Sequence, residues 1–134
     1  MISSEKVGSK FYQNLGNLFY AMAMVDQKVA PKEIDKLRSF IRKYWLDVDM
    51  VEDEFGTDAA YQIEIVFDWL VSVKKDPDQC YEAFEEYYGS NQKKFTPFLK
   101  MLIIDTAHAI ANAFSNLNKS ELVLLGKLRL LFSV

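Results

Sequence analysis

The sequence predicts a single all-α domain over residues 1–134, with about six helices that include two related helical hairpins. Apolar residues recur at helical spacing along the chain, and no segment shows the alternation of a strand. In addition, the stretch Phe19–Ile34 returns in altered form at Ala107–Leu122. These observations favour a helical domain whose two ends resemble each other.

The internal repeat has an offset of 88 residues, and it places apolar residues on apolar residues. The matched positions are Phe11 with Leu99, Leu15 with Ile103, Met22 with Ile110, Val29 with Leu117, Glu33 with Glu121, and Leu37 with Leu125. Two copies cannot stack into a continuous array, so we interpret the repeat as one helical hairpin at each end of the chain.

The first hairpin is predicted from two helical patterns and a proline. Apolar residues from Val7 to Val25 form one stripe, and Pro31 suits the first turn of a second helix that runs to Trp45. The second helix is expected to bury Ile34, Leu37, Phe40, Ile41 and Tyr44.

Two further helices are predicted in the middle of the chain. An acidic connector, residues 47–58, precedes a helix from Asp58 to Lys74 that we expect to be well buried. Asp76 and Pro77 are typical of a helix start, and Gly89 suits a left-handed end for that helix.

The second hairpin begins at Thr96-Pro97, another cap followed by proline. Its first helix, to Phe114, is apolar on most sides and is expected to be the most enclosed. Asn118 is placed to cap the last helix. The residues expected to be buried there are Leu122, Leu125, Leu128, Leu131 and Phe132.

Composition narrows the classes of partner. A net charge of -3 provides no basic field, which excludes nucleic acid as the main partner. Aromatic residues make up 14% of the chain, more than a core of this size is expected to need. The surplus, with the Tyr87-Tyr88 pair, led us to expect a contact surface and weak homodimerisation.

The N-terminus lacks the apolar run and cleavage site of a signal peptide, and no apolar segment reaches 18 residues. We therefore expect a cytoplasmic protein with no membrane span. The single cysteine, Cys80, cannot form an internal disulfide. A nucleophile–base pair of Cys80 with His108 is disfavoured, because the two residues lie on different predicted helices.

The segment from Ala23 to Glu33, reading AMVDQKVAPKE, resembles the first signature of the tellurite-resistance TerB-like family. Asp26, Glu33 and Glu121 match that pattern, whereas Gln27 replaces the usual glycine and Phe114 replaces an aspartate of the second half. The resemblance implies an all-helical bacterial cytoplasmic accessory domain that is associated with the tellurite stress response and is often near membranes. It implies no catalysis.

The resemblance also implies a divalent-cation site at Asp26, Glu33 and Glu121. We favour a structural interpretation, because Ala30 at the cap position of the second helix has no side-chain acceptor and Asp26 can supply one. The expected function is therefore a non-enzymatic interaction domain that docks protein partners and needs no cofactor. The alternative is a divalent-metal sensor that uses Asp26 and Glu33.

Overall fold

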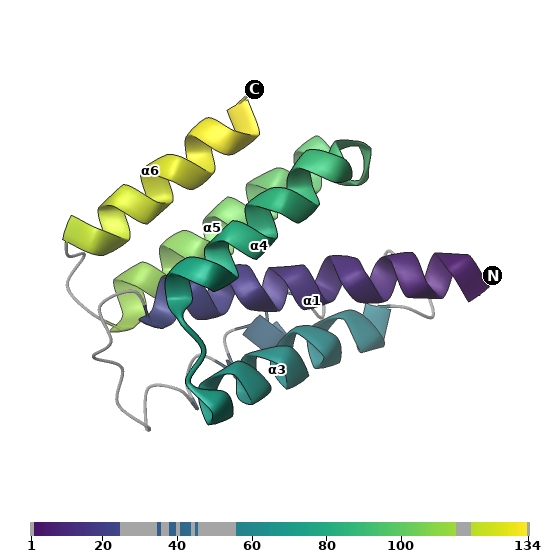
Figure 1. The fold of residues 1–134 in the computed structure, drawn as a ribbon, viewed down its shortest axis with the longest axis horizontal. Coiled ribbons are helices and arrows are strands. Elements are labelled where there is room, and N and C mark those ends of the chain that lie inside the picture. Colours follow the sequence, from purple (N-terminus) through teal and green to yellow (C-terminus); the bar gives the residue numbers. More distant parts are fainter. Residues whose placement is uncertain are drawn as a thin grey trace.

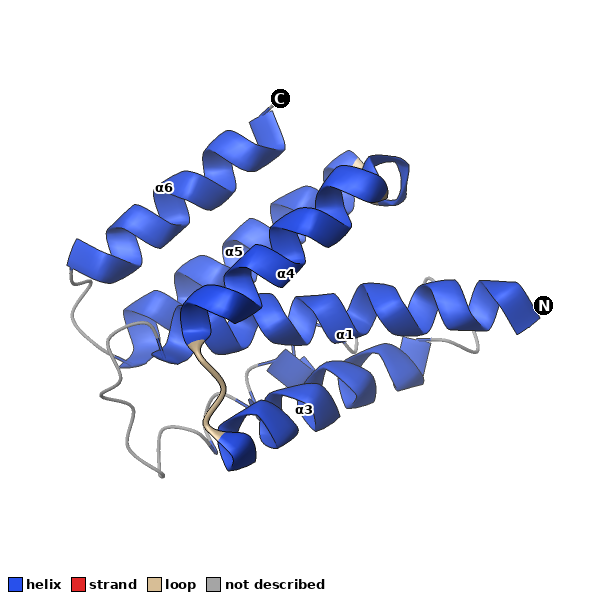
Figure 2. Cartoon of the chain, in the orientation of Figure 1, coloured by secondary structure: helices blue, strands red, loops and turns tan. Residues whose placement is uncertain are grey.

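The computed structural model describes residues 2–24, 35, 38–39, 41–43, 45, 56–114 and 119–133. These residues contain helices and short connections without a strand, which confirms the all-α prediction (Figure 2). The described residues between 35 and 45, called here the 35–45 segment, are all helical. The complete elements are α1 (Ile2–Met24), α3 (Gly56–Val73), α4 (Pro77–Ser90), the 3₁₀ turn η2 (Gln92–Lys94), α5 (Pro97–Phe114) and α6 (Lys119–Ser133).

Helix α1 lies at the centre of the fold. It contacts α3, α4, α5 and α6, and Figure 1 shows it running between α3 on one side and α4 with α5 on the other. The C-terminal half of α1 is almost entirely buried, with Leu15, Leu18 and Phe19 fully covered. The helix begins at Ile2 rather than near Val7, because no proline interrupts the backbone pattern before the apolar stripe starts.

The contact between α1 and α3 depends on a glycine. A Cβ added at Gly16 would lie 2.8 Å from Val66 Cγ1 and 3.3 Å from the backbone oxygen of Ile63. Any larger residue at this position would therefore push α3 away from α1. Around this contact, α3 buries Ile63, Phe67 and Leu70.

Helices α3 and α4 are joined by a tight connection with well-formed caps. The backbone N–H groups of Lys74 and Lys75 donate to the carbonyls of Val71 and Leu70, which is the Schellman pattern. Lys74 occupies the left-handed region with φ 55°. Asp76 then accepts a bond from the backbone N–H of Asp78 at 3.2 Å, which confirms the predicted start of α4.

The predicted start of α5 is also confirmed, since Thr96 Oγ1 accepts a bond from the Leu99 N–H. The predicted end of α4 is wrong. Gly89 is not left-handed, and α4 continues to Ser90 with Asn91 as its C-cap. The cap N–H bonds to the Tyr88 carbonyl, and the Asn91 side chain bonds to the Tyr87 carbonyl, so no left-handed glycine is needed.

Many of the aromatic side chains that were expected to form a contact surface instead form a cluster inside the protein. Phe95 lies at its centre, with ring centroids 4.9 Å from both Phe11 and Tyr88. The other rings come from α4 and α6: Phe84, Tyr87 and Phe132. Tyr88 is buried and Tyr87 is half-buried, so this pair no longer indicates a homodimer surface.

Two predictions about burial in the second hairpin are wrong. Helix α5 is not the most enclosed helix, because Phe98 and Met101 on its first turns are exposed. On α6, Leu122 is exposed, and Leu124 takes a place in the core that was not predicted. The burial of Leu125, Leu128 and Phe132 is as predicted.

Two of the described repeat pairs have matching environments, whereas Phe11 is buried and its match Leu99 is only partly buried. Leu15 and Ile103 are both fully buried, and Met22 and Ile110 are buried at the next pair. Several partners, among them Leu37 and Val29, lie outside the described residues. The relationship between the two hairpins therefore stays a prediction.

Candidate functional site

The predicted cation ligands are not brought together by the described residues. Asp26 and Glu33 lie outside them, and Glu121 lies on α6 with its side chain outside what the structure describes. Residues 47–55 of the acidic connector also fall outside. Within the ranges that are described, no group of three His, Cys, Asp or Glu residues could hold a metal ion. The metal interpretation stays a prediction.

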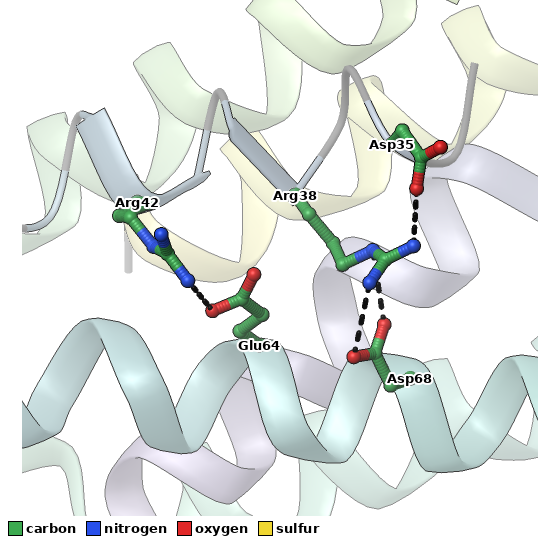
Figure 3. A network of polar contacts seen from close by, with 5 residues as sticks. All are labelled: Asp35, Arg38, Arg42, Glu64 and Asp68. Carbon is green, nitrogen blue, oxygen red and sulfur yellow. Dashed lines mark hydrogen bonds and ion pairs between the residues drawn. The ribbon is translucent and has the colours of Figure 1, made fainter. Parts of the chain in front are cut away.

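A group of ion pairs holds the 35–45 segment against α3 (Figure 3). Arg38 pairs with Asp35 on its own segment and with Asp68 on α3, where its Nε lies 3.2 Å from Asp68 Oδ1. One turn away, Arg42 donates to Glu64 Oε1 at 2.7 Å. Both arginines therefore face acids one helical turn apart on α3.

Burial and four charged side chains determine the electrostatic balance at Asp68, itself one of the four. Burial raises the pKa of the Asp68 carboxyl, and the negative charges of Glu64 and Asp35 act in the same direction. The Arg38 guanidinium opposes the shift without overcoming it. A carboxylate whose charge is already paired with an arginine is a poor candidate for binding a metal ion or another charged group.

The 35–45 segment is also attached to the core by Trp45. Its indole is fully buried, and Nε1 donates to Thr106 Oγ1 on α5 at 3.2 Å. Thr106 Oγ1 in turn donates to the Leu102 carbonyl at 2.8 Å. This buried polar chain joins the segment to α5, while the arginines join it to α3.

Cys80 lacks the environment of a nucleophile. The thiol is buried on α4, and burial raises its pKa to about 11, with Lys75 lowering it only in part. A reactive cysteine requires the opposite shift, since the thiolate is the nucleophile. His108 lies on a different helix, α5, as the sequence predicts.

A pocket of about 480 Å³ lies where α1, α3 and α4 meet. Its described walls are Tyr20, Met24, Val71, Lys74, Lys75, Asp76 and Pro77. The Tyr20 hydroxyl already donates to the Lys75 carbonyl at 2.7 Å, and burial, followed by Cys80 and Asp76, raises its pKa. The pocket therefore offers apolar contact and two lysines rather than an acid–base pair.

Four lysines flank α4: Lys74 and Lys75 precede it, and Lys93 and Lys94 follow it. A helix of 14 residues separates the two pairs by about 20 Å, so each pair is considered separately.

The most distinctive surface lies on the outer face of α3. Ile65, Trp69 and Val73 are 62%, 57% and 48% exposed, and their spacing of four residues places them in one row along the helix. We call this row the α3 stripe. It lies beside Glu64 and Asp68, whose charges are paired with Arg42 and Arg38. The arrangement is an apolar centre with a neutralised polar border, which is typical of a protein interface.

The α3 stripe was missed because α3 is apolar on two faces. The sequence pattern predicts a well-buried helix with one wide apolar stripe made of Ile63, Val66, Phe67, Leu70 and Val73. The expected burial of Val73 is wrong. The signal that could have identified it is the row of Ile65 and Trp69, which lies out of phase with Ile63 and Phe67. Which row faces α1 depends on packing.

Comparison of the chain with models of known families, with curated proteins and with solved structures found no match. The resemblance of residues 23–33 to the TerB-like family therefore stays a prediction. Within the described part of the chain, no helix combines the length and hydropathy needed to cross a bilayer.

Proposed function

We propose that this chain is a non-enzymatic interaction domain that binds an amphipathic helix of a protein partner through the α3 stripe. The observation that carries the proposal is the exposed row of Ile65, Trp69 and Val73. The resemblance of the first hairpin to the TerB-like family supports an accessory role in a stress response, and we include it in the proposal.

The size and shape of the stripe suit a helical partner. The residues from Ile65 to Val73 cover slightly more than two turns of α3, a length of about 12 Å. An amphipathic helix presents apolar side chains at the same spacing and can lie along such a row. Trp69 has the residue type most enriched among binding hot spots, so we assign it as the anchor.

The charged residues beside the α3 stripe favour a partner helix with acidic side chains. On one side of the stripe, the acids Glu64 and Asp68 are paired with arginines and carry little unbalanced charge. At its C-terminal end, Lys74 and Lys75 are exposed, and neither forms an ion pair with another described residue. The backbone N–H groups of the same two residues cap α3.

The two nearby acids are engaged in part by the start of α4. The Asp76 carboxylate caps α4 through the Asp78 N–H, and Asp78 itself lies in the first turn of α4. Negative charge at a helix N-terminus is stabilised by the helix dipole. We therefore expect the partner helix to carry Glu or Asp near the end that meets Lys74 and Lys75.

The test uses a synthetic helical peptide with leucine at positions i, i+4 and i+8 and glutamate at one end. Trp69 is exposed whereas Trp45 is fully buried, so binding should shift tryptophan emission to shorter wavelength. The shift should disappear in Trp69→Phe, which leaves only Trp45. Binding should weaken at least about tenfold in Trp69→Ser and in a peptide with lysine in place of glutamate.

Phe98→Ser is the matched control, because Phe98 is an exposed aromatic residue on α5. It should leave peptide binding unchanged. Equal binding of the acidic and basic peptides, equal loss in Phe98→Ser, or binding only to anionic lipid vesicles would each contradict the proposal.

A further inference from the structure

The pocket where α1, α3 and α4 meet combines apolar walls with a charged rim. Its volume of about 480 Å³ lies in the range of pockets that hold small molecules, about 300–1,000 Å³. The described walls form two sets: Tyr20, Met24, Val71 and Pro77 are buried or half-buried, and Lys74, Lys75 and Asp76 are exposed. Such a division suits a ligand with an apolar body and a charged head.

Hydrogen bonds hold the walls of this pocket in place. The Tyr20 hydroxyl on α1 donates to the Lys75 carbonyl at 2.7 Å, which ties α1 to the loop between α3 and α4 (Figure 2). Both ends of that loop are capped, by the Schellman bonds of α3 and by the Asp76 side chain at the start of α4. A site that is formed before its ligand arrives loses little affinity to ordering.

Lys74 occupies a backbone position that usually belongs to glycine. Its φ of 55° and the bond of its N–H to the Val71 carbonyl place it at the left-handed residue of the Schellman motif. A side chain makes this conformation less favourable than it is for glycine, because the Cβ crowds the backbone. The end of α3 does not require a lysine here, whereas a site for an anion does.

The charges that line the pocket favour a ligand with one negative charge. Lys74 and Lys75 contribute two positive charges and Asp76 one negative charge, a net charge of +1. The Asp76 carboxylate also accepts the Asp78 N–H at 3.2 Å, so it is held beside the lysines. A carboxylate matches this balance, whereas a phosphate monoester brings nearly two negative charges close to Asp76.

We propose that this pocket binds a small monocarboxylate with a hydrocarbon chain, such as a medium-chain fatty acid. The chain lies against the apolar walls, and the carboxylate lies at Lys74 and Lys75. This inference does not rest on the function proposed for the α3 stripe. Because both lysines also lie at the end of that stripe, the test includes one variant that is specific to each site.

The test is calorimetric titration of the full chain with octanoate at concentrations below the onset of micelles. We expect saturable binding at one site, with a Kd of about 1 mM or tighter for a ligand of this size. Octanol has a similar chain without the charge and should bind at least about threefold more weakly. Octylamine reverses the charge and acetate lacks the chain, so neither should show saturable binding.

Lys74→Gly separates a ligand-binding role from a structural one. It should raise the thermal midpoint, because glycine adopts the left-handed conformation without strain, and it should weaken octanoate binding at least about threefold. Lys93→Gly is the matched control, since it removes the same charge from an exposed lysine beyond the far end of α4, about 20 Å away. It should leave the Kd for octanoate unchanged.

Two further variants separate the pocket from the α3 stripe. Val71→Phe places a larger side chain on a pocket wall and should weaken octanoate binding at least about tenfold, while binding of the helical peptide is kept. Trp69→Ser should leave octanoate binding unchanged, because Trp69 does not line the pocket. Failure of one proposal is thereby distinguished from failure of the other.

Several results would overturn the pocket proposal. Equal binding of octanol and octanoate would show that the lysines do not recognise the charge. An unchanged Kd in Lys74→Gly, or loss of octanoate binding in Trp69→Ser, would place the ligand elsewhere. Octyl phosphate that binds at least about tenfold more tightly than octanoate would assign the pocket to a phosphorylated amphiphile instead.

Discussion

The two faces of α3 carry similar side chains in opposite surroundings. The inner face places Ile63, Phe67 and Leu70 in the core, whereas the outer face leaves Ile65, Trp69 and Val73 in contact with water. Both rows are apolar and both follow helical spacing. Apolar content therefore identifies a helix that packs against other elements. The position of α1 decides which of the two apolar rows of α3 is buried within the chain.

The largest expected difference is between two aromatic residues that are two positions apart on α3. Phe67→Ala should lower the free energy of unfolding by about 3–5 kcal/mol, because it opens a cavity in the core. Trp69→Ala should lower it by less than about 1 kcal/mol, since much of the indole is already exposed. Urea denaturation of both variants measures the contrast, and equal losses would show that the outer row is covered within the chain.

The buried thiol of Cys80 on α4 allows the contrast between buried and exposed side chains to be tested by changing the pH. Because the folded pKa of Cys80 is raised to about 11 from its usual value near 9, its contribution to stability is complete below pH 9 and is lost as the pH rises through 11. The contribution is about 2–3 kcal/mol.

The measurement compares the wild type with Cys80→Ala, so that the lysines and tyrosines common to both proteins cancel. The difference in the free energy of unfolding should shift against the wild type between pH 9 and 11. A difference that stays constant from pH 8 to 11 would mean that water reaches the thiol.

The smallest expected effect concerns the close contact between α1 and α3. Gly16→Ala adds a methyl group 2.8 Å from Val66 Cγ1, which should cost about 1–3 kcal/mol of strain, partly offset by up to about 1 kcal/mol of helix propensity. A net loss of about 1–2 kcal/mol in thermal or urea unfolding is expected. Val66→Ala in the same protein should recover part of it, because it removes the atoms that clash; independent losses would place the strain elsewhere.

The sequence predicted the caps of α4 and α5 more reliably than the burial of side chains. Asp76 and Thr96 cap α4 and α5 as expected, because a cap depends on the few residues that follow it. Gly89 was assigned a left-handed turn that the structure replaces with Asn91, since the Asn91 side chain and N–H satisfy two carbonyls of α4. A glycine permits a helix to end without requiring it.

The candidate site was less predictable than the fold. The ligands expected from the family resemblance, Asp26 and Glu33, fall outside the described residues. The α3 stripe was not predicted, and its residue Val73 was wrongly grouped with the buried row. The role of Arg38 and Arg42 was also missed, because their acids on α3 lie 30 and 22 residues away along the chain. No local pattern connects residues at that separation.

The sequence by itself determined an all-helical chain, the boundaries of α5, the caps of α4 and α5, and most of the inner rows of α3 and α6. These features follow from hydrogen bonds and spacing within one or two turns. Only the tertiary structure decided that Trp45 is buried against α5, that several aromatic rings surround Phe95, and that one apolar row of α3 and Leu122, Val123 and Leu130 of α6 remain exposed. Burial depends on how closely other elements approach a helix. An amphipathic pattern shows that the helix has an apolar face, but it does not show which element covers that face.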